Sequence, residues 1–156
     1  MSPRFIVAML IGSLAAIACR WSGRGGTALP GLVAERIFPN FVEKLTNLFI
    51  SEAILITGTN GKTTTARILA SIFEESGSSV VHNREGSNLM RGIGSALLSS
   101  IPKLWEASWV SYGFYIKPHK AIALMEVDEA VLPYAVSALQ PKAIVFTNKI
   151  VFRNER

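Results

Sequence analysis

The chain has 156 residues, and 49% of them are hydrophobic, which is enough for one packed domain or slightly more. The formal net charge is +5, which could suit nucleic acid, anionic lipid or nucleotide phosphates, but the Lys and Arg residues are scattered, so nucleic acid is not favoured. Cys19 is the only cysteine in the sequence, so an internal disulfide framework and an all-cysteine zinc site are excluded.

The first predicted element is an apolar stretch from Phe5 to Cys19, interrupted by Gly12 and Ser13. It is shorter than the about 20 residues that a membrane-spanning helix needs. Two interpretations remain open: a signal or anchor segment, and a helix that is buried or apposed to a membrane. The second is favoured, because the nucleotide site predicted further along the chain belongs in the cytoplasm. Three cations follow the stretch and either lie near anionic headgroups or are ordinary solvated charges: Arg20, Arg24 and Arg36.

A turn-rich linker is predicted next, from Ser22 to Gly31, because this segment is rich in glycine. A helix should follow from about Leu32 to Leu48, with a break near Pro39. Its apolar residues recur at spacings of three and four, which predicts one buried face: Phe41, Leu45, Leu48 and Phe49. These segments make up a predicted N-terminal helical region, residues 1–50, ahead of a domain at residues 51–156.

From residue 51 onward, strand and helix patterns alternate. The expected strands are 53–57, 80–82, 121–127 and 143–147, and the expected helices are 64–76, 92–100 and 129–139. The helix at 64–76 should bury Ile68, Leu69, Ile72 and Phe73 on one face. The helix at 92–100 should stop before Pro102, and residues 103–118 are expected to be irregular. This alternation predicts an α/β domain whose parallel sheet carries helices on both faces.

The most informative motif is Gly58-Thr59-Asn60-Gly61-Lys62-Thr63-Thr64, which lies between the first strand and the first helix of this domain. A glycine-rich turn that opens a helix is typical of a phosphate-binding loop, because its backbone N–H groups can turn toward phosphate oxygens. Lys62 would then reach the β- and γ-phosphates of a nucleotide, most simply ATP, and the Thr63 hydroxyl would bind Mg²⁺. Ile56 stands where the general motif has its first glycine, so this loop is a variant of that motif.

Glu126 is the second candidate for chemistry. It ends an apolar strand, at the sheet edge where open α/β sheets bind their ligands. A carboxylate buried there without a cation would be costly, so we predict that Glu126 holds Mg²⁺. Asp128 follows closely, and it either joins the site or only caps the next helix.

Three further polar residues, His82, Asn83 and Asn88, follow the start of the second strand and share this sheet edge. They could contact phosphate, metal or substrate, although Asn is also common in ordinary loops. Neither His82 nor His119 has a partner His or Cys at ligand spacing, so both are assigned structural roles.

Together these residues resemble the Mur ligases, which form amide bonds in peptidoglycan precursors, and folylpolyglutamate synthases share the loop 56–65. Four further segments are similar to the MurT-type subunits of lipid II isoglutaminyl synthase within that family. They are Gly25 to Gly31, Asn83 to Gly92, Met125 to Ala130, and Gln140-Pro141 through Thr147-Asn148. The likeness covers residues 22 to 148 and implies the central ATP-binding domain of a Mur ligase, preceded by an N-terminal helical segment.

The resemblance also implies a reaction. ATP would phosphorylate the α-carboxylate of D-glutamate in the lipid II stem peptide, and ammonia from a GatD-type glutaminase subunit would convert the acyl phosphate to D-isoglutamine. Lys62 and Glu126 would be catalytic, and Thr63 and Glu126 would hold Mg²⁺. The residues that bind ATP would be Gly58, Thr59, Asn60, Gly61, Lys62, Thr63, Thr64 and Asn88. The chain would work in the cytoplasm, with peripheral contact at the inner face of the plasma membrane where its lipid substrate lies.

The resemblance weakens after Asn148, where members of the family continue with a Phe-Arg-Asp-Gln-like stretch and this sequence has Lys149 to Arg156. By that comparison the zinc insertion and the domain that binds the glutaminase would be absent. The chain is therefore expected to be a truncated form with weak or no activity alone. Two alternatives remain open: another Mur or folylpolyglutamate-type ligase, and a non-catalytic nucleotide-binding fragment.

Overall fold

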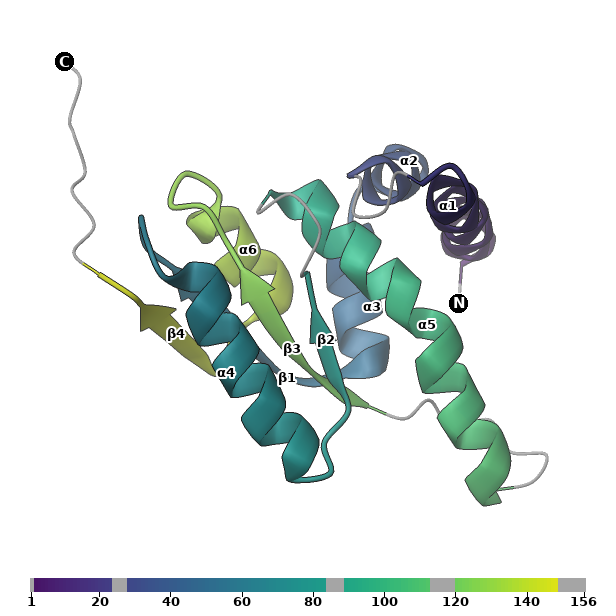
Figure 1. Cartoon of the computed structure of the whole chain (residues 1–156). Helices are drawn as coiled ribbons and strands as arrows, with labels where there is room; N and C mark the ends of the chain where they lie inside the picture. Colours follow the sequence, from purple (N-terminus) through teal and green to yellow (C-terminus); the bar gives the residue numbers. More distant parts are fainter. Residues whose placement is uncertain (1, 24–27, 84–88, 113–119, 149–156) are drawn as a thin grey trace, which may run out of the picture.

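The computed structural model describes residues 2–23, 28–83, 89–112 and 120–148 (Figure 1). Its strands form a parallel sheet in the order β2-β3-β1-β4. They are β1 (Ile50–Thr57), β2 (Val80–His82), β3 (Ala121–Glu126) and β4 (Ala143–Phe146). The helices are α1 (Pro3–Trp21), α2 (Leu29–Ile37), α3 (Phe41–Phe49), α4 (Lys62–Glu75), α5 (Met90–Tyr112) and α6 (Leu132–Leu139). The α/β class and the parallel sheet predicted from the sequence are confirmed.

The sheet brings the carboxyl ends of its strands to one edge. β1 lies between β3 and β4, with Ile56 opposite Glu126 and Thr57 opposite Phe146. β2 pairs with the other side of β3. Because the strands run parallel, the residues that follow them meet at this edge, which is where open α/β sheets bind ligands. The central strands β1 and β3 are largely buried, as their near-continuous apolar runs predict.

Helices cover both faces of this sheet. α4 lies across one face, and α3 and α6 lie behind the other (Figure 1). The side of α4 that packs on the sheet contains the fully buried small residues Ala66 and Ala70. The prediction that Ile68 and Ile72 are buried is wrong, because their side chains are 56% and 58% exposed. At about 100° per residue, they lie roughly 160° around the helix axis from the two alanines, on the side of α4 that faces away from the sheet.

Three helices precede the sheet and pack with α5. α1 begins after Ser2, whose hydroxyl accepts a hydrogen bond from the Phe5 N–H, and α2 packs against both α1 and α5. The break predicted near Pro39 is confirmed, because α2 and α3 lie on either side of it. Residues Leu29–Gly31 were expected to be linker but form the first turn of α2. Proline suits this position, since the first N–H groups of a helix have no partner within it.

One cluster of buried side chains joins these helices to the sheet. It includes Phe5 of α1, Phe41 and Leu45 of α3, Ile93 of α5 and Leu55 of β1. Apolar side chains from both parts of the chain therefore leave water together, which is the main favourable term in folding. The division of the chain into regions 1–50 and 51–156 remains a prediction.

α5 is longer than the sequence predicts. Its end was expected before Pro102, whereas the helix runs to Tyr112. A proline inside a helix removes one backbone hydrogen bond, but good helix formers on either side can keep the helical dihedral angles. Residues 103–112 were expected to be irregular, but they are helical. The rest of that stretch, 113–118, lies outside the described residues, as do residues 84–88.

Candidate functional site

The loop between β1 and α4 adopts backbone angles that favour glycine. Gly58 and Gly61 have φ values of +133° and +82°, which L side chains rarely adopt. A Cβ atom on Gly58 would also overlap Thr147 Oγ1 and lie 2.6 Å from Asn148 Oδ1. α4 begins at Lys62, directly after the loop, so its first N–H groups face the loop. The loop therefore lies at the positive end of a helix dipole, which favours an anion.

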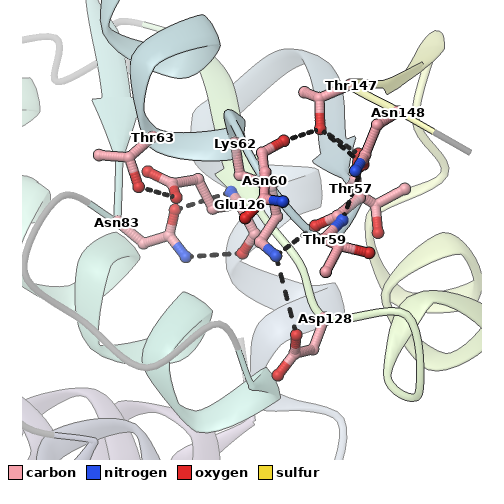
Figure 2. A network of polar contacts seen from close by, with 11 residues as sticks. Thr57, Thr59, Asn60, Lys62, Thr63, Asn83, Glu126, Asp128, Thr147 and Asn148 are labelled. Carbon is pink, nitrogen blue, oxygen red and sulfur yellow. Dashed lines mark hydrogen bonds and ion pairs between the residues drawn. The ribbon is translucent and has the colours of Figure 1, made fainter. Parts of the chain in front are cut away.

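Thr63 and Glu126 meet at the carboxyl edge of the sheet (Figure 2). Thr63 Oγ1 donates a hydrogen bond to Glu126 Oε2 at 2.7 Å. Glu126 is the last residue of β3 and is only 3% exposed. The two residues that the sequence analysis assigned to Mg²⁺ thus present neighbouring oxygen atoms, which are the ligands that Mg²⁺ prefers.

Two residues at the end of β2 hold Glu126. Asn83 pairs with its backbone, since Asn83 Nδ2 donates to the Glu126 carbonyl oxygen and the Glu126 N–H donates to Asn83 Oδ1, both at 2.9 Å (Figure 2). His82 Nε2 lies 3.1 Å from Glu126 Oε1, and the two side chains are 3% and 5% exposed. The structural role assigned to His82 did not anticipate this contact. Its position at the carboxyl end of a strand was the signal that could have revealed it.

Lys62 is turned toward its own loop. Its Nζ donates a hydrogen bond to the Gly58 carbonyl oxygen and lies 4.0 Å from Asp128 Oδ1 (Figure 2). The interpretation of Asp128 as a helix cap is wrong, because α6 begins only at Leu132. Asp128 instead provides a counter-charge for the lysine beside the loop.

The residues after β4 support the loop from another side (Figure 2). Asn148 Oδ1 accepts a hydrogen bond from the Thr59 N–H at 2.8 Å. Thr147 Oγ1 donates to the Asn60 carbonyl oxygen at 2.5 Å. The Thr147 N–H donates to the Thr57 carbonyl oxygen at 3.0 Å, which extends the pairing of β1 and β4 to the start of the loop. The sequence analysis gave neither Thr147 nor Asn148 a role in the site, although both follow an apolar strand.

The structure says less about the remaining residues that were predicted to bind ATP. Thr59 and Asn60 lie in the turn between the two loop glycines, and the hydrogen bonds that tie them to Asn148 and Thr147 use their backbone atoms. Thr64 is exposed on the first turn of α4. Asn88 lies outside the described residues.

The groups at this edge fit a nucleoside triphosphate with Mg²⁺. The loop and the start of α4 offer backbone N–H groups, Lys62 offers a cation, and Thr63 with Glu126 offers two neighbouring oxygens. Glycine at positions 58 and 61 keeps side-chain atoms out of the turn. Such an arrangement can bind a polyphosphate and stabilise the charge that develops when its terminal phosphoryl group is transferred.

Comparisons with known sequences point to one family. Residues 56–149 match the model of the Mur ligase middle domain. The chain is 32% identical over 142 residues to the lipid II isoglutaminyl synthase (glutamine-hydrolyzing) subunit MurT of Staphylococcus aureus strain COL. It is 33% identical over 133 residues to the protein of the same name from Streptococcus pneumoniae strain ATCC BAA-255 / R6. These alignments cover 90% and 85% of this chain but only 29% and 26% of the relatives, so the chain spans less than a third of their length.

A solved structure has the same fold. It is the UDP-N-acetylmuramoylalanyl-D-glutamyl-2,6-diaminopimelate--D-alanyl-D-alanyl ligase from Acinetobacter baumannii, which matches with a TM-score of 0.51 and 21% identity. The match covers 79% of this chain and 24% of that ligase, and at this identity it supports the fold alone. The family model covers more than half of the chain, including the loop, α4 and Glu126. The chain therefore belongs to the Mur ligase family.

Proposed function

We propose that this chain is the nucleotide-binding part of an ATP- and Mg²⁺-dependent carbon–nitrogen ligase of peptidoglycan synthesis. The observation that carries the proposal is the 2.7 Å contact between Thr63 Oγ1 and Glu126 Oε2, next to a glycine loop at the start of α4. A loop of this kind binds phosphate, and the paired oxygens suit a metal that also binds phosphate.

The reaction that we propose is the amidation of lipid II, which the names of the MurT relatives support. The α-carboxylate of D-glutamate in the stem peptide would take the terminal phosphoryl group of ATP. Ammonia would then attack the acyl carbon and release phosphate, which leaves D-isoglutamine. A GatD-type glutaminase subunit would hydrolyse glutamine to supply the ammonia.

Each residue of the site has a part in this proposal. ATP with Mg²⁺ supplies the phosphoryl group that activates the carboxylate. Lys62 would neutralise phosphate charge, and Thr63 with Glu126 would hold the metal. Four residues would keep these groups in position, two behind Glu126 and two behind the loop: His82, Asn83, Thr147 and Asn148.

The proposal gives these residues the nucleotide chemistry only. Contacts with the glutaminase and with the acceptor would belong largely to the parts of the MurT relatives that the alignment does not cover. The 156 residues by themselves should therefore bind nucleotide but amidate lipid II weakly or not at all. The proposed location is the cytoplasm, at the inner face of the membrane that contains lipid II.

Calorimetric titration with ATP tests the nucleotide site. The wild-type chain should bind ATP in the presence of Mg²⁺, and Lys62→Ala should weaken binding at least about tenfold, since a charge-assisted hydrogen bond contributes roughly 1.5–3 kcal/mol. Lys142→Ala is the matched control, because Lys142 pairs with Glu52 at the opposite edge of the sheet. Equal binding by the wild type and Lys62→Ala would contradict the proposal.

The same titration tests the metal site. Thr63→Val removes the hydroxyl at nearly constant volume and should abolish most of the Mg²⁺ dependence of ATP binding. Thr63→Ser keeps the hydroxyl and should retain that dependence. If valine and serine behave alike, the hydroxyl does not hold a metal.

A further inference from the structure

α1 is apolar on all sides, but the described fold covers only one side. This inner face packs against α2 and α5 through Phe5, Ala8, Gly12 and Ala16, which are all buried. The approach is close, since a Cβ atom on Gly12 would lie 2.8 Å from Leu98 Cδ1. A helix that is apolar on all sides is normally covered on all sides, by protein or by lipid. The uncovered side of α1 therefore points to a partner.

The outer face of α1 is a continuous apolar surface. It consists of seven side chains that are between 40% and 89% exposed: Ile6, Val7, Leu10, Ile11, Leu14, Ile17 and Trp21. These seven are half of the fourteen large hydrophobic side chains that are exposed among the residues whose side chains the structure describes, which exclude 102–112 of α5. Single exposed hydrophobic residues are ordinary, but a surface of this kind marks a site of interaction.

The charged residues of α1 itself are all positive. Arg4 and Arg20 are exposed near the two ends of α1, and no acidic residue occurs in the sequence before Glu35. Trp21 ends the helix with 89% of its side chain exposed, and tryptophan favours the boundary between lipid and water. Cations beside an apolar surface complement anionic lipid headgroups.

We propose that the outer face of α1 binds the surface of an anionic lipid bilayer, with the helix axis lying in the membrane plane. By length and composition alone, α1 could also cross a membrane. Crossing would pull Phe5 and Ala8 out of the core that they share with Ala34 and Leu98, whereas lying flat covers the outer face and leaves the inner face packed. The proposal does not rest on the ligase function, because vesicle binding requires no nucleotide.

Co-sedimentation with vesicles tests this proposal. The wild-type chain should bind vesicles of phosphatidylglycerol and phosphatidylcholine at least about tenfold better than vesicles of phosphatidylcholine alone, and salt should weaken that binding. The double variant Leu10→Glu/Leu14→Glu should lose at least about tenfold in binding, because it places two charges on the outer face. Both leucines are more than half exposed, so the fold does not depend on burying them.

The matched control changes a different helix in the same way. Ile68 and Ile72 on α4 are 56% and 58% exposed, close to the 57% and 65% of Leu10 and Leu14. Ile68→Glu/Ile72→Glu should therefore bind vesicles as the wild type does. Bromine-labelled lipid should quench part of the tryptophan fluorescence of the wild type, and Trp21→Phe should remove that part.

Four results would overturn the proposal. The first is an absence of vesicle binding by the wild type, and the second is an equal loss of vesicle binding in the two double variants. The third is a wild-type dimer that does not bind vesicles and that Leu10→Glu/Leu14→Glu dissociates, which would show that the outer face binds a second copy of the chain. The fourth is resistance of the membrane-bound chain to alkaline extraction, which would show that α1 spans the bilayer. Circular dichroism of each variant confirms that the helices are intact before binding is compared.

Discussion

At the scale of single residues, the site depends on how Glu126 is held. Its two carboxylate oxygens face Thr63 at 2.7 Å and His82 at 3.1 Å. A buried polar atom that loses its hydrogen-bond partner costs about 1–3 kcal/mol. His82→Leu should therefore lower the free energy of unfolding by about that amount, measured by chemical denaturation, and weaken Mg²⁺-dependent ATP binding, measured by calorimetry.

A conservative variant separates this role from simple packing. His82→Gln keeps an N–H that can donate to the same carboxylate oxygen, so it should recover much of the stability and of the Mg²⁺ dependence. If His82 only fills space in the core, leucine should be tolerated better than glutamine, because leucine needs no polar partner. That order of stabilities would contradict the prediction.

Some residues of the site could be assigned to it from the sequence, and others could not. Thr63 follows a glycine loop with a local signature, and Glu126 interrupts an apolar strand, so each signals chemistry by itself. Thr147 and Asn148 belong to a segment that resembles MurT-type subunits, but no local motif assigned them to the site. Their contacts with the loop arise because β4 lies beside β1 in the sheet, and strand order is set by packing of the whole domain.

At the scale of elements, α2 and α5 cross at a glycine. A Cβ atom on Gly31 would overlap the Arg91 carbonyl oxygen and lie 2.9 Å from Ser95 N, and both are backbone atoms of α5. Gly31→Ala should therefore force the helices apart and lower the free energy of unfolding by about 3 kcal/mol. Chemical denaturation measures this loss.

Gly12 of α1 offers a matched substitution. A Cβ atom there would lie 2.8 Å from the tip of the flexible Leu98 side chain, which can move aside, and 3.2 Å from the Ala34 Cβ, a contact that a shift of a few tenths of an ångström relieves. Alanine also favours a helix over glycine by about 1 kcal/mol. Gly12→Ala should thus be close to neutral, and similar losses for the two variants would show that backbone contact at Gly31 does not set the helix spacing.

The same crossing explains one limit of the sequence analysis. Gly31 lies in a glycine-rich segment that predicts a loop, yet in the structure it lies in α2 and allows α2 and α5 to approach each other closely. Alternation of strand and helix, by contrast, predicted the position of each described strand, because apolar runs of strand length are local. The buried face of α4 could not be predicted from the sequence, because the helix carries apolar residues on more than one face. Contact with the sheet buries the face with Ala66 and Ala70.

At the scale of the whole molecule, the attachment of the N-terminal helices should depend on pH. Glu35 of α2 is half-buried, and this burial raises the pKa of its carboxyl above the ordinary value, while the nearby Arg91 cation on α5 partly offsets the rise. The folded chain therefore binds this proton more tightly than the unfolded chain. By linkage, ionisation of Glu35 lowers the stability of the fold above the raised pKa, and this loss disappears as the pH falls below the ordinary glutamate pKa.

Glu35→Gln should consequently stabilise the chain at neutral pH, and its advantage over the wild type should shrink as the pH falls through the raised pKa of Glu35. Denaturation at a series of pH values measures the difference. Glu43→Gln on α3 is the matched control, because Glu43 is exposed and water already solvates its charge. Arg91→Gln should have the opposite effect to Glu35→Gln at neutral pH, since it removes the cation that favours the ionised carboxylate. A Glu35→Gln advantage that is constant across the pH range would show that packing of α2 against α5, and not the charge of Glu35, limits stability there.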